Sequence, residues 1–396
     1  TQVASLSGNA FYYYYVASYT WQPVFYVAGG TNENDLNWNA SYAVILNCNT
    51  IINELPASDG TAQEKEALIA EAKVHRADAY LTLVNAYAKP YNATTASTDL
   101  GLPLLTVQTV SQSLKRASVQ QIYNQIIDDL TSAIPALPNT QAYNTLPSKA
   151  SAYAELARCY LYMNNYAEAN RYADLALSLR STLNDLAVYT PTSTNYPRRI
   201  ADPEVILSKI TNGGTMAYQG TAFKLSDELL TLLGTADQRY NLFTVPGTTI
   251  GTGYTGRFFY KERFVGETRN VGPSVPEMML IKAECDARAG SGALAMQTIN
   301  KLRESRFRAG EFVALTAVDN SDALIKVLAE RRRELMGQGG FRWFDLKRLN
   351  KESEFAKTIT HTFAGQTFTL APNSDRYQMP YAPIYYDYAP NLQKNP

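Results

Sequence analysis

Glu33 and Asp35 are the one acidic pair of the sequence with aromatic company, and they lie near Trp38 in a segment rich in glycine and asparagine. Glycoside hydrolases work with two closely spaced carboxylates, so a glycosidase is one interpretation of this pair. Oxygen-rich side chains in such a loop could also hold a calcium ion. A third interpretation is that both carboxylates are simply solvated. The sequence leaves all three open.

The aromatic residues around this pair favour carbohydrate binding. Tyrosine accounts for 28 of the 396 residues, and its ring and hydroxyl suit wet contact surfaces. Flat rings can stack on the apolar faces of sugars, while neighbouring amide and carboxylate groups hydrogen-bond to sugar hydroxyls. The alternative for each single ring is that it packs in the interior. On this basis we predict eight ligand-binding residues: Trp21, Tyr26, Asn34, Asp35, Trp38, Tyr91, Asn92 and Tyr254.

Histidine and cysteine are too scarce for much other chemistry. The two histidines, His75 and His361, cannot form a histidine-rich zinc site. The three cysteines are far apart and form no CxxC pair, which predicts buried free thiols: Cys48, Cys159 and Cys285. The leading interpretation of the sequence includes no metal, no cofactor and no catalytic residue.

Gly251, Gly253 and Gly256 have the spacing of a dinucleotide-binding fingerprint. That fingerprint needs a buried strand before it and a helix after it. Here a Val-Pro-Gly sequence precedes the glycines and the strand-like residues 257–260 follow them. We therefore predict a loop or hairpin.

Charge excludes another class of partner. The chain has 36 basic and 36 acidic side chains. A neutral protein lacks the electrostatic attraction that nucleic-acid binding requires, so no nucleic-acid partner is expected. No run of 18 apolar residues occurs, so no helix is expected to span a membrane.

Helical periodicity dominates most of the chain. An apolar stripe over 62–88 places His75 on a core-facing helix, and Ser118 is a candidate cap for a second helix. The stripe consists of Leu68, Ala72, His75, Ala79 and Leu83. Residues 148–180 match the tetratricopeptide register at seven positions, with a turn at Asn164 and Asn165: Leu156, Ala157, Tyr160, Tyr166, Ala169, Ala173 and Ala176.

We predict a mainly α fold in a single domain over residues 1–396. About four helix pairs form a tetratricopeptide-like scaffold, because repeat helices bury their apolar faces only when stacked. Their ranges are about 62–137, 148–180, 276–305 and 321–349. Irregular, loop-rich segments with a few short strands lie outside this scaffold and are the expected site of ligand binding: 1–40, 181–275 and 359–396.

The charged run that most resembles a functional motif consists of Arg331, Arg332 and Arg333. On a helix they fan around a wide arc and cannot form one phosphate-binding row. We predict that arginine–carboxylate pairs lock the last helices together.

The run ERRRELMGQGGFRWFDLKR (330–348) resembles the signature of the SusD/RagB family of outer-membrane nutrient-binding lipoproteins. Residues 71–105 and 276–306 resemble its first and third repeats, and the tail resembles its closing segment (DRYQMP, 375–380, and NLQKNP, 391–396). Gly339 replaces the usual acidic residue of the signature.

This resemblance implies a single, mostly helical domain with four tetratricopeptide-like units. It also implies an outer-membrane protein that faces the cell exterior, with a TonB-dependent transporter of the SusC type as partner. The lipid anchor would lie upstream of Thr1, because the sequence does not begin with a cysteine. The family's ligand contacts follow no shared motif, so the eight predicted residues depend on the aromatic argument alone.

The leading hypothesis is therefore a non-enzymatic protein that binds an oligosaccharide for the transporter. Three alternatives remain open: a peptide-binding protein like the RagB branch, a glycosidase that uses Glu33 and Asp35, and a tetratricopeptide scaffold for protein tails.

Overall fold

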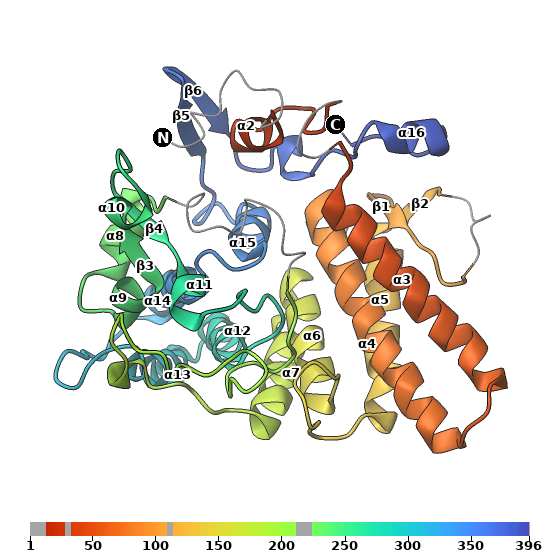
Figure 1. Cartoon of the computed structure of the whole chain (residues 1–396), viewed down its shortest axis with the longest axis horizontal. Helices are drawn as coiled ribbons and strands as arrows, with labels where there is room; N and C mark the ends of the chain where they lie inside the picture. Colours follow the sequence, from red (N-terminus) through yellow and green to blue (C-terminus); the bar gives the residue numbers. More distant parts are fainter. Residues whose placement is uncertain (1–12, 28–32, 109–113, 211–223, 396) are drawn as a thin grey trace. The chain divides into compact units, whose positions relative to one another are not determined.

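The computed structural model describes residues 13–27, 33–108, 114–210 and 224–395. Helices dominate these residues and the strands are few and short, as predicted (Figure 1). The chain divides into two compact units. The terminal unit comprises Thr1–Leu137, Tyr162–Asn164 and Arg342–Pro396, and the central unit comprises Pro138–Leu161 and Asn165–Phe341. The organisation as one domain stays a prediction.

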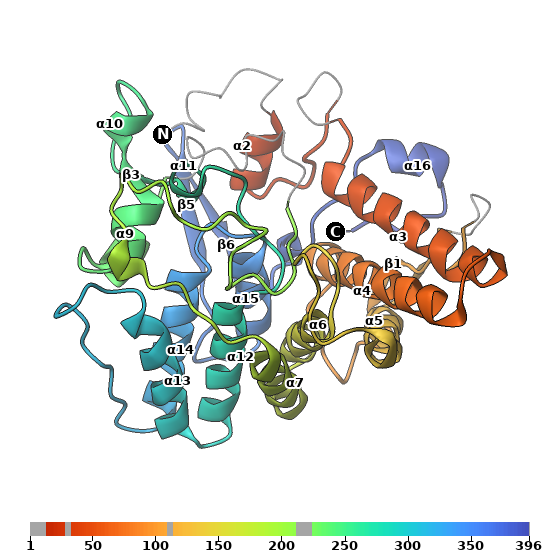
Figure 2. The same cartoon turned by 60° about the horizontal axis from the view of Figure 1, so that its bottom comes forward.

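Three long helices form the body of the terminal unit: α3 (Leu36–Glu54), α4 (Ala62–Tyr87) and α5 (Val119–Ala133). They lie side by side in both Figure 1 and Figure 2, with α4 in contact with both neighbours. The shorter elements of the unit are α2 (Tyr13–Tyr19), η2 (Leu55–Ala57), η3 (Ile134–Ala136), α15 (Phe341–Leu349), η7 (Asp375–Tyr377) and α16 (Ile384–Tyr388), with the antiparallel strand pairs β1 (Leu100–Pro103) with β2 (Arg116–Ser118) and β5 (Ile359–Phe363) with β6 (Gln366–Leu370).

Local sequence sets the starts of α4 and α5. Thr61 and Glu64 form a capping box at the start of α4, and Ser118 and Gln121 form one at the start of α5, so the predicted Ser118 cap is confirmed. Each box satisfies backbone N–H groups that the first helical turn leaves without a partner.

A buried polar network joins the three helices. The Arg76 guanidinium contacts the Asp129 carboxylate at 2.6 Å and donates from Nη1 to Oδ1 of Asn49 at 2.7 Å. These three side chains come from α4, α5 and α3, so the network fixes the register in which the helices pack.

The predicted apolar stripe on α4 is buried only in part. Ala72, Ala79 and Leu83 are buried, but half of Leu68 is exposed and His75 is half-buried. Most residues in the first two turns of α4 are themselves exposed, so this end of the helix is covered only in part.

The central unit contains two of the predicted helix pairs. The first is α6 (Lys149–Tyr162) with α7 (Tyr166–Leu179), and the second is α12 (Val275–Arg288) with α13 (Gly292–Glu304). α12 also packs against α7 and α14 (Asn320–Glu334), as Figure 2 shows. Asn164 has a positive φ of 58° and Asn165 caps α7, which confirms the predicted asparagine turn. The other elements are η4 (Leu186–Val188), α8 (Asp227–Leu233), α9 (Gln238–Phe243), β3 (Thr244–Pro246), α10 (Gly247–Ile250), β4 (Arg257–Phe259) and α11 (Lys261–Val265).

The predicted arginine–carboxylate pairs are confirmed at the end of α14. Glu330 is fully buried and binds Arg239, Arg303 and Arg333 at 2.6–3.0 Å. Glu334 binds Arg239 and Arg306 at 2.6 and 2.9 Å. The first part of the charged run is therefore structural.

The glycine spacing belongs to a hairpin, as predicted. β3 and β4 pair in antiparallel register, and Gly253 and Gly256 in the connection between them have positive φ angles. The three cysteines are buried and free, as predicted. In the described ranges no helix has the length and apolar character of a membrane span, and no group of three or more histidine, cysteine or acidic side chains could hold a metal ion.

Candidate functional site

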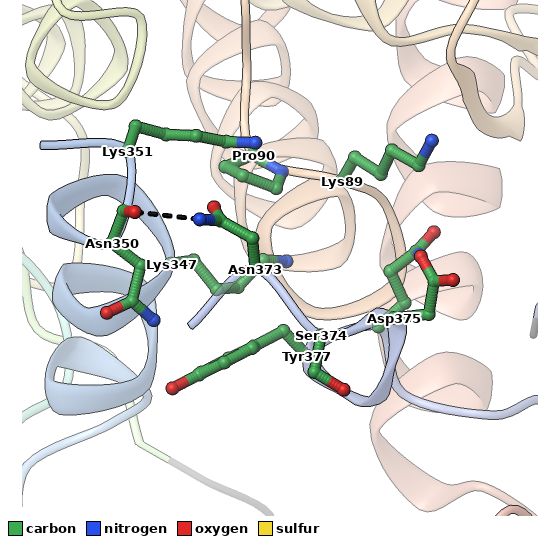
Figure 3. A pocket seen from close by; sticks show the side chains of 10 residues that line it. Lys89, Pro90, Lys347, Asn350, Lys351, Asn373, Ser374, Asp375 and Tyr377 are labelled. Atoms are coloured by element: carbon green, nitrogen blue, oxygen red, sulfur yellow. Dashed lines mark hydrogen bonds between the residues drawn. The ribbon is translucent and has the colours of Figure 1, made fainter. Parts of the chain in front are cut away.

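A pocket of about 170 Å³ lies in the terminal unit (Figure 3). Three segments that are distant in the sequence form its wall: the loop after α4, the end of α15 and the residues around η7. The lining residues are Lys89, Pro90, Lys347, Asn350, Lys351, Asn373, Ser374, Asp375, Tyr377 and Gln378.

Lys347 holds two of these segments together. Its buried ammonium donates to the backbone oxygens of Asn85 at 2.5 Å and Ala88 at 2.6 Å, at the end of α4. The helix C-terminus attracts positive charge because its last carbonyl groups have no partner within the helix. Burial lowers the pKa of the Lys347 ammonium to about 7.

An aromatic cluster adjoins the pocket through Tyr377. The Trp343 ring lies 4.7 Å from the Tyr377 ring, and its Nε1 donates to the Tyr377 backbone oxygen at 3.2 Å. Trp21 packs against the same group, which also contains Leu346 and Leu370. Of the predicted ligand-binding residues, Trp21 therefore belongs to a cluster that borders this pocket.

Trp21 is also an outer ring of a stack of three rings. The His361 ring lies between Tyr19 and Trp21, with centroid distances of 4.2 Å and 4.3 Å and nearly parallel planes. All three side chains are half-buried. Trp21 has a φ of 54°, a strained value for a residue with a Cβ, and such strain concentrates at functional positions. We call Tyr19, His361 and Trp21 the ring stack.

The sequence analysis missed His361 as a candidate. Strand β5 pairs with β6 so that His361 lies opposite Phe368, and the His361 Nδ1 lies 2.8 Å from the Tyr19 backbone oxygen. The signal that could have found it is the two-residue alternation of threonine with His361 and Phe363, which places both on one side of a strand.

Tyr26, Asp35 and Trp38 come together, but in the interior of the unit. Trp38 is 8% exposed and Tyr26 is 3% exposed. Asp35 caps α3 by accepting from the Asn37 and Trp38 backbone nitrogens at 3.1 Å each. Neither ring has an open face for a sugar, so ligand contact there would require this packing to open.

Tyrosine hydroxyls complete the surroundings of Asp35. Tyr87 and Tyr26 donate to its carboxylate. Burial raises the pKa of Asp35, although these hydrogen bonds act in the opposite direction. The carboxylate is thus occupied by donors from four residues, a structural arrangement that supports neither a glycosidase nor a calcium site.

We expect Asp35→Ala to lower the free energy of unfolding by about 2–4 kcal/mol, because it removes a helix cap and leaves buried hydroxyl groups without an acceptor. Asp35→Asn should cost less than about 1 kcal/mol, since asparagine caps as well as aspartate and carries no charge to bury. Urea denaturation of both variants, with exposed Asp59→Ala as control, measures the difference. Equal losses in the two Asp35 variants would contradict this role.

The other predicted ligand-binding residues belong neither to the ring stack nor to the buried group around Asp35. Tyr91 is buried and donates to Gln120 Oε1 at 2.6 Å, whereas Asn92 is exposed and its Oδ1 accepts from the Thr94 backbone. Asn34 is exposed next to Asp35. Tyr254 is half-buried in the central unit, where its ring contacts Phe258.

Two family models match the chain. Residues 3–161 match the model described as "SusD-like_3: Starch-binding associating with outer membrane", and residues 275–396 match the model of the SusD family, SusD_RagB. Two relatives come from Formosa agariphila. SusD-like protein P38 is 24% identical over 81% of this chain and 73% of its own length, and SusD-like protein P2 is 24% identical over 80% and 72%.

Solved structures share the fold. A SusD superfamily protein from Bacteroides thetaiotaomicron superposes with a TM-score of 0.75 at 22% identity, over 91% of this chain and 85% of its own. A SusD-like carbohydrate binding protein from Bacteroides vulgatus gives a TM-score of 0.66 at 20% identity, over 90% and 83%. The two matched segments together span most of the sequence, and the helical scaffold and these relatives agree with them. The chain therefore belongs to the SusD/RagB family.

Proposed function

We propose that this protein binds an oligosaccharide at the cell surface and delivers it to a TonB-dependent outer-membrane transporter of the SusC type, without chemical conversion. The observation that carries the proposal is the half-buried ring stack, whose Trp21 joins the aromatic cluster at the pocket of the terminal unit. The matching family model is that of starch-binding proteins, and the similar B. vulgatus protein is described as carbohydrate binding, and both support the ligand class.

The arrangement suits a sugar chain because it combines rings with hydrogen-bonding groups. A half-buried ring offers apolar surface without the cost of ordering a flexible side chain. Asn350 supplies a donor along the pocket wall, and Asn373, Ser374 and Gln378 supply donors and acceptors. Exposed Asn92 follows Pro90 of that wall by two residues and is a further candidate contact.

Membership of the SusD/RagB family supports the transporter partnership and the outer-membrane location in this proposal. The proposal includes a lipid anchor and many copies on one surface, so that weak single sites still retain a polymer.

We expect Trp21→Ala to weaken binding to a glycan at least about ten-fold, because truncation of a tryptophan at a binding centre removes much of its contact energy. Affinity electrophoresis against a panel of polysaccharides measures the retardation. Tyr388→Ala is the matched control, because Tyr388 is 82% exposed and belongs to neither the ring stack nor the pocket.

Thermal unfolding of both variants separates lost binding from lost folding. Unchanged retardation of folded Trp21→Ala on a glycan that binds the unmodified protein would exclude the ring stack as the site. Binding to mixed peptides in place of every glycan would favour the RagB-like alternative.

A further inference from the structure

Positive charge surrounds the pocket of the terminal unit. Lys89, Lys347 and Lys351 line it, whereas Asp375 is its one acidic lining residue. Lys89 also pairs with Asp99 outside the lining at 3.4 Å, so the excess comes mainly from Lys347 and Lys351. The whole chain has equal numbers of basic and acidic side chains, so this excess is local. Figure 3 shows Lys89 on the loop after α4, and Lys347 and Lys351 at the end of α15.

Within the described ranges, Lys347 has no carboxylate as a hydrogen-bonding partner. Lys347 is 3% exposed, and its two acceptors are the carbonyl oxygens at the end of α4. An ammonium has three N–H donors, so one more remains for a ligand. A buried charge that lacks an opposite charge is costly, and an anion in the pocket would reduce that cost.

Two further buried donors belong to the wall. Tyr377 and Asn350 are each 3% exposed, and the Tyr377 hydroxyl lies close to the Asn350 side chain. Neither this hydroxyl nor the Asn350 Nδ2 has a partner of normal hydrogen-bond geometry among the described residues. The acceptors of Asn350 are in use, because its Oδ1 accepts from the Lys357 backbone and its main-chain oxygen accepts from Asn373.

The buried part of the wall at Lys347, Asn350 and Tyr377 is thus rich in donors and poor in free acceptors. A neutral sugar hydroxyl both donates and accepts, so it brings a further donor and would leave these buried donors incompletely paired. A carboxylate or sulfate group presents only acceptors and carries the opposite charge.

We propose that the pocket binds an anionic group of the glycan, a carboxylate or a sulfate ester, so that the preferred ligands are acidic oligosaccharides. This inference rests on the proposed function and names the ligand class of the same site.

The binding should depend on pH. A bound anion favours the charged form of Lys347, so binding takes up protons where this ammonium is partly neutral. Affinity should therefore fall as pH rises above about 7, the pKa to which burial lowers the group. The titratable groups around the pocket besides Lys347 are Lys89, Lys351, Asp375 and Tyr377.

The experiment compares matched ligands by isothermal titration calorimetry. One pair is an oligogalacturonate and its methyl ester, which differ only in carboxylate charge. The other is a sulfated galactan oligosaccharide and its desulfated form. We expect at least one acidic member to bind about ten-fold more tightly than its neutral partner, and to lose affinity between pH 6 and pH 8.

The variant Lys89→Glu/Lys351→Glu should remove this preference, because both lysines are exposed and their reversal adds repulsion without disturbing the core. Lys301→Glu, an exposed lysine of α13 that lines neither described pocket, should leave it unchanged. Binding of neutral glycans without any acidic preference, or an acidic preference that survives the double variant, would overturn this inference while the proposed function stands. No binding to any glycan would overturn both.

Discussion

Arg239→Met is expected to lower the free energy of unfolding by about 3–5 kcal/mol. The Arg239 guanidinium is 1% exposed and contacts three carboxylates, those of Asp237, Glu330 and Glu334, at 2.6–2.7 Å. Methionine fills similar space but leaves these buried charges with fewer opposite charges. The loss should exceed that of an ordinary surface ion pair, which is about 0–1 kcal/mol.

Chemical denaturation at pH 7 tests this expectation, with Arg332→Met as control. Arg332 belongs to the same charged run, but its partner Glu228 is half exposed. A loss in Arg239→Met no greater than in Arg332→Met would show that the buried network contributes little.

The loss of stability in Arg239→Met should also depend on pH. Burial alone would raise the pKa of Glu334, but Arg306 and Arg239 outweigh it and lower the pKa to about 2. A carboxylate whose pKa is lower in the folded than in the unfolded protein stabilises above its unfolded pKa, and this stability is lost as pH falls toward the folded pKa. The difference between the unmodified protein and Arg239→Met should therefore shrink between about pH 4.5 and pH 2.

Trp38→Ala is expected to destabilise the protein by about 3–5 kcal/mol, because it empties a large buried site. The Trp38 ring contacts the rings of Tyr42, Tyr87 and Tyr381 at centroid distances of 4.6–5.2 Å. Trp38→Phe keeps much of this packing and should lose less. Thermal or urea unfolding measures both changes.

This result decides how a binding experiment at Trp38 is interpreted. If Trp38→Ala is as stable as the unmodified protein, the Trp38 side chain does not contribute to the core. The result would then favour its predicted role in ligand binding. If it unfolds as expected, reduced glycan binding by this variant reports lost structure.

Local patterns determined most of the scaffold. The Ser118 cap, the asparagine turn before α7 and the hairpin at the glycine spacing depend on residues that are near one another in the chain, so each could be predicted from the sequence. The charged run from Glu330 to Arg348 indicated both the family and its own structural role.

The site depended on contacts that no local pattern describes. Trp21 and Trp38 have the same side chain in similar aromatic surroundings, yet only Trp21 is half exposed. Trp38 is covered by rings from α4 and from residues near the C-terminus, whereas Trp21 stacks on His361 from a hairpin some 340 residues later. Burial is decided by such partners, so a sequence rich in aromatics could not distinguish a ligand platform from a core.

Lys347 shows the same division between sequence and structure. Its position in the family signature was evident from the sequence, and the sequence predicted a purely structural role for that run. Only the tertiary structure turned its ammonium to the end of α4 and placed it beside Tyr377 in the wall of a pocket. The sequence alone determined which helices form and to which family the chain belongs, because both depend on short-range periodicity and on motifs. The folded structure decided which polar groups are buried with an unused donor, because that depends on every segment packed around them.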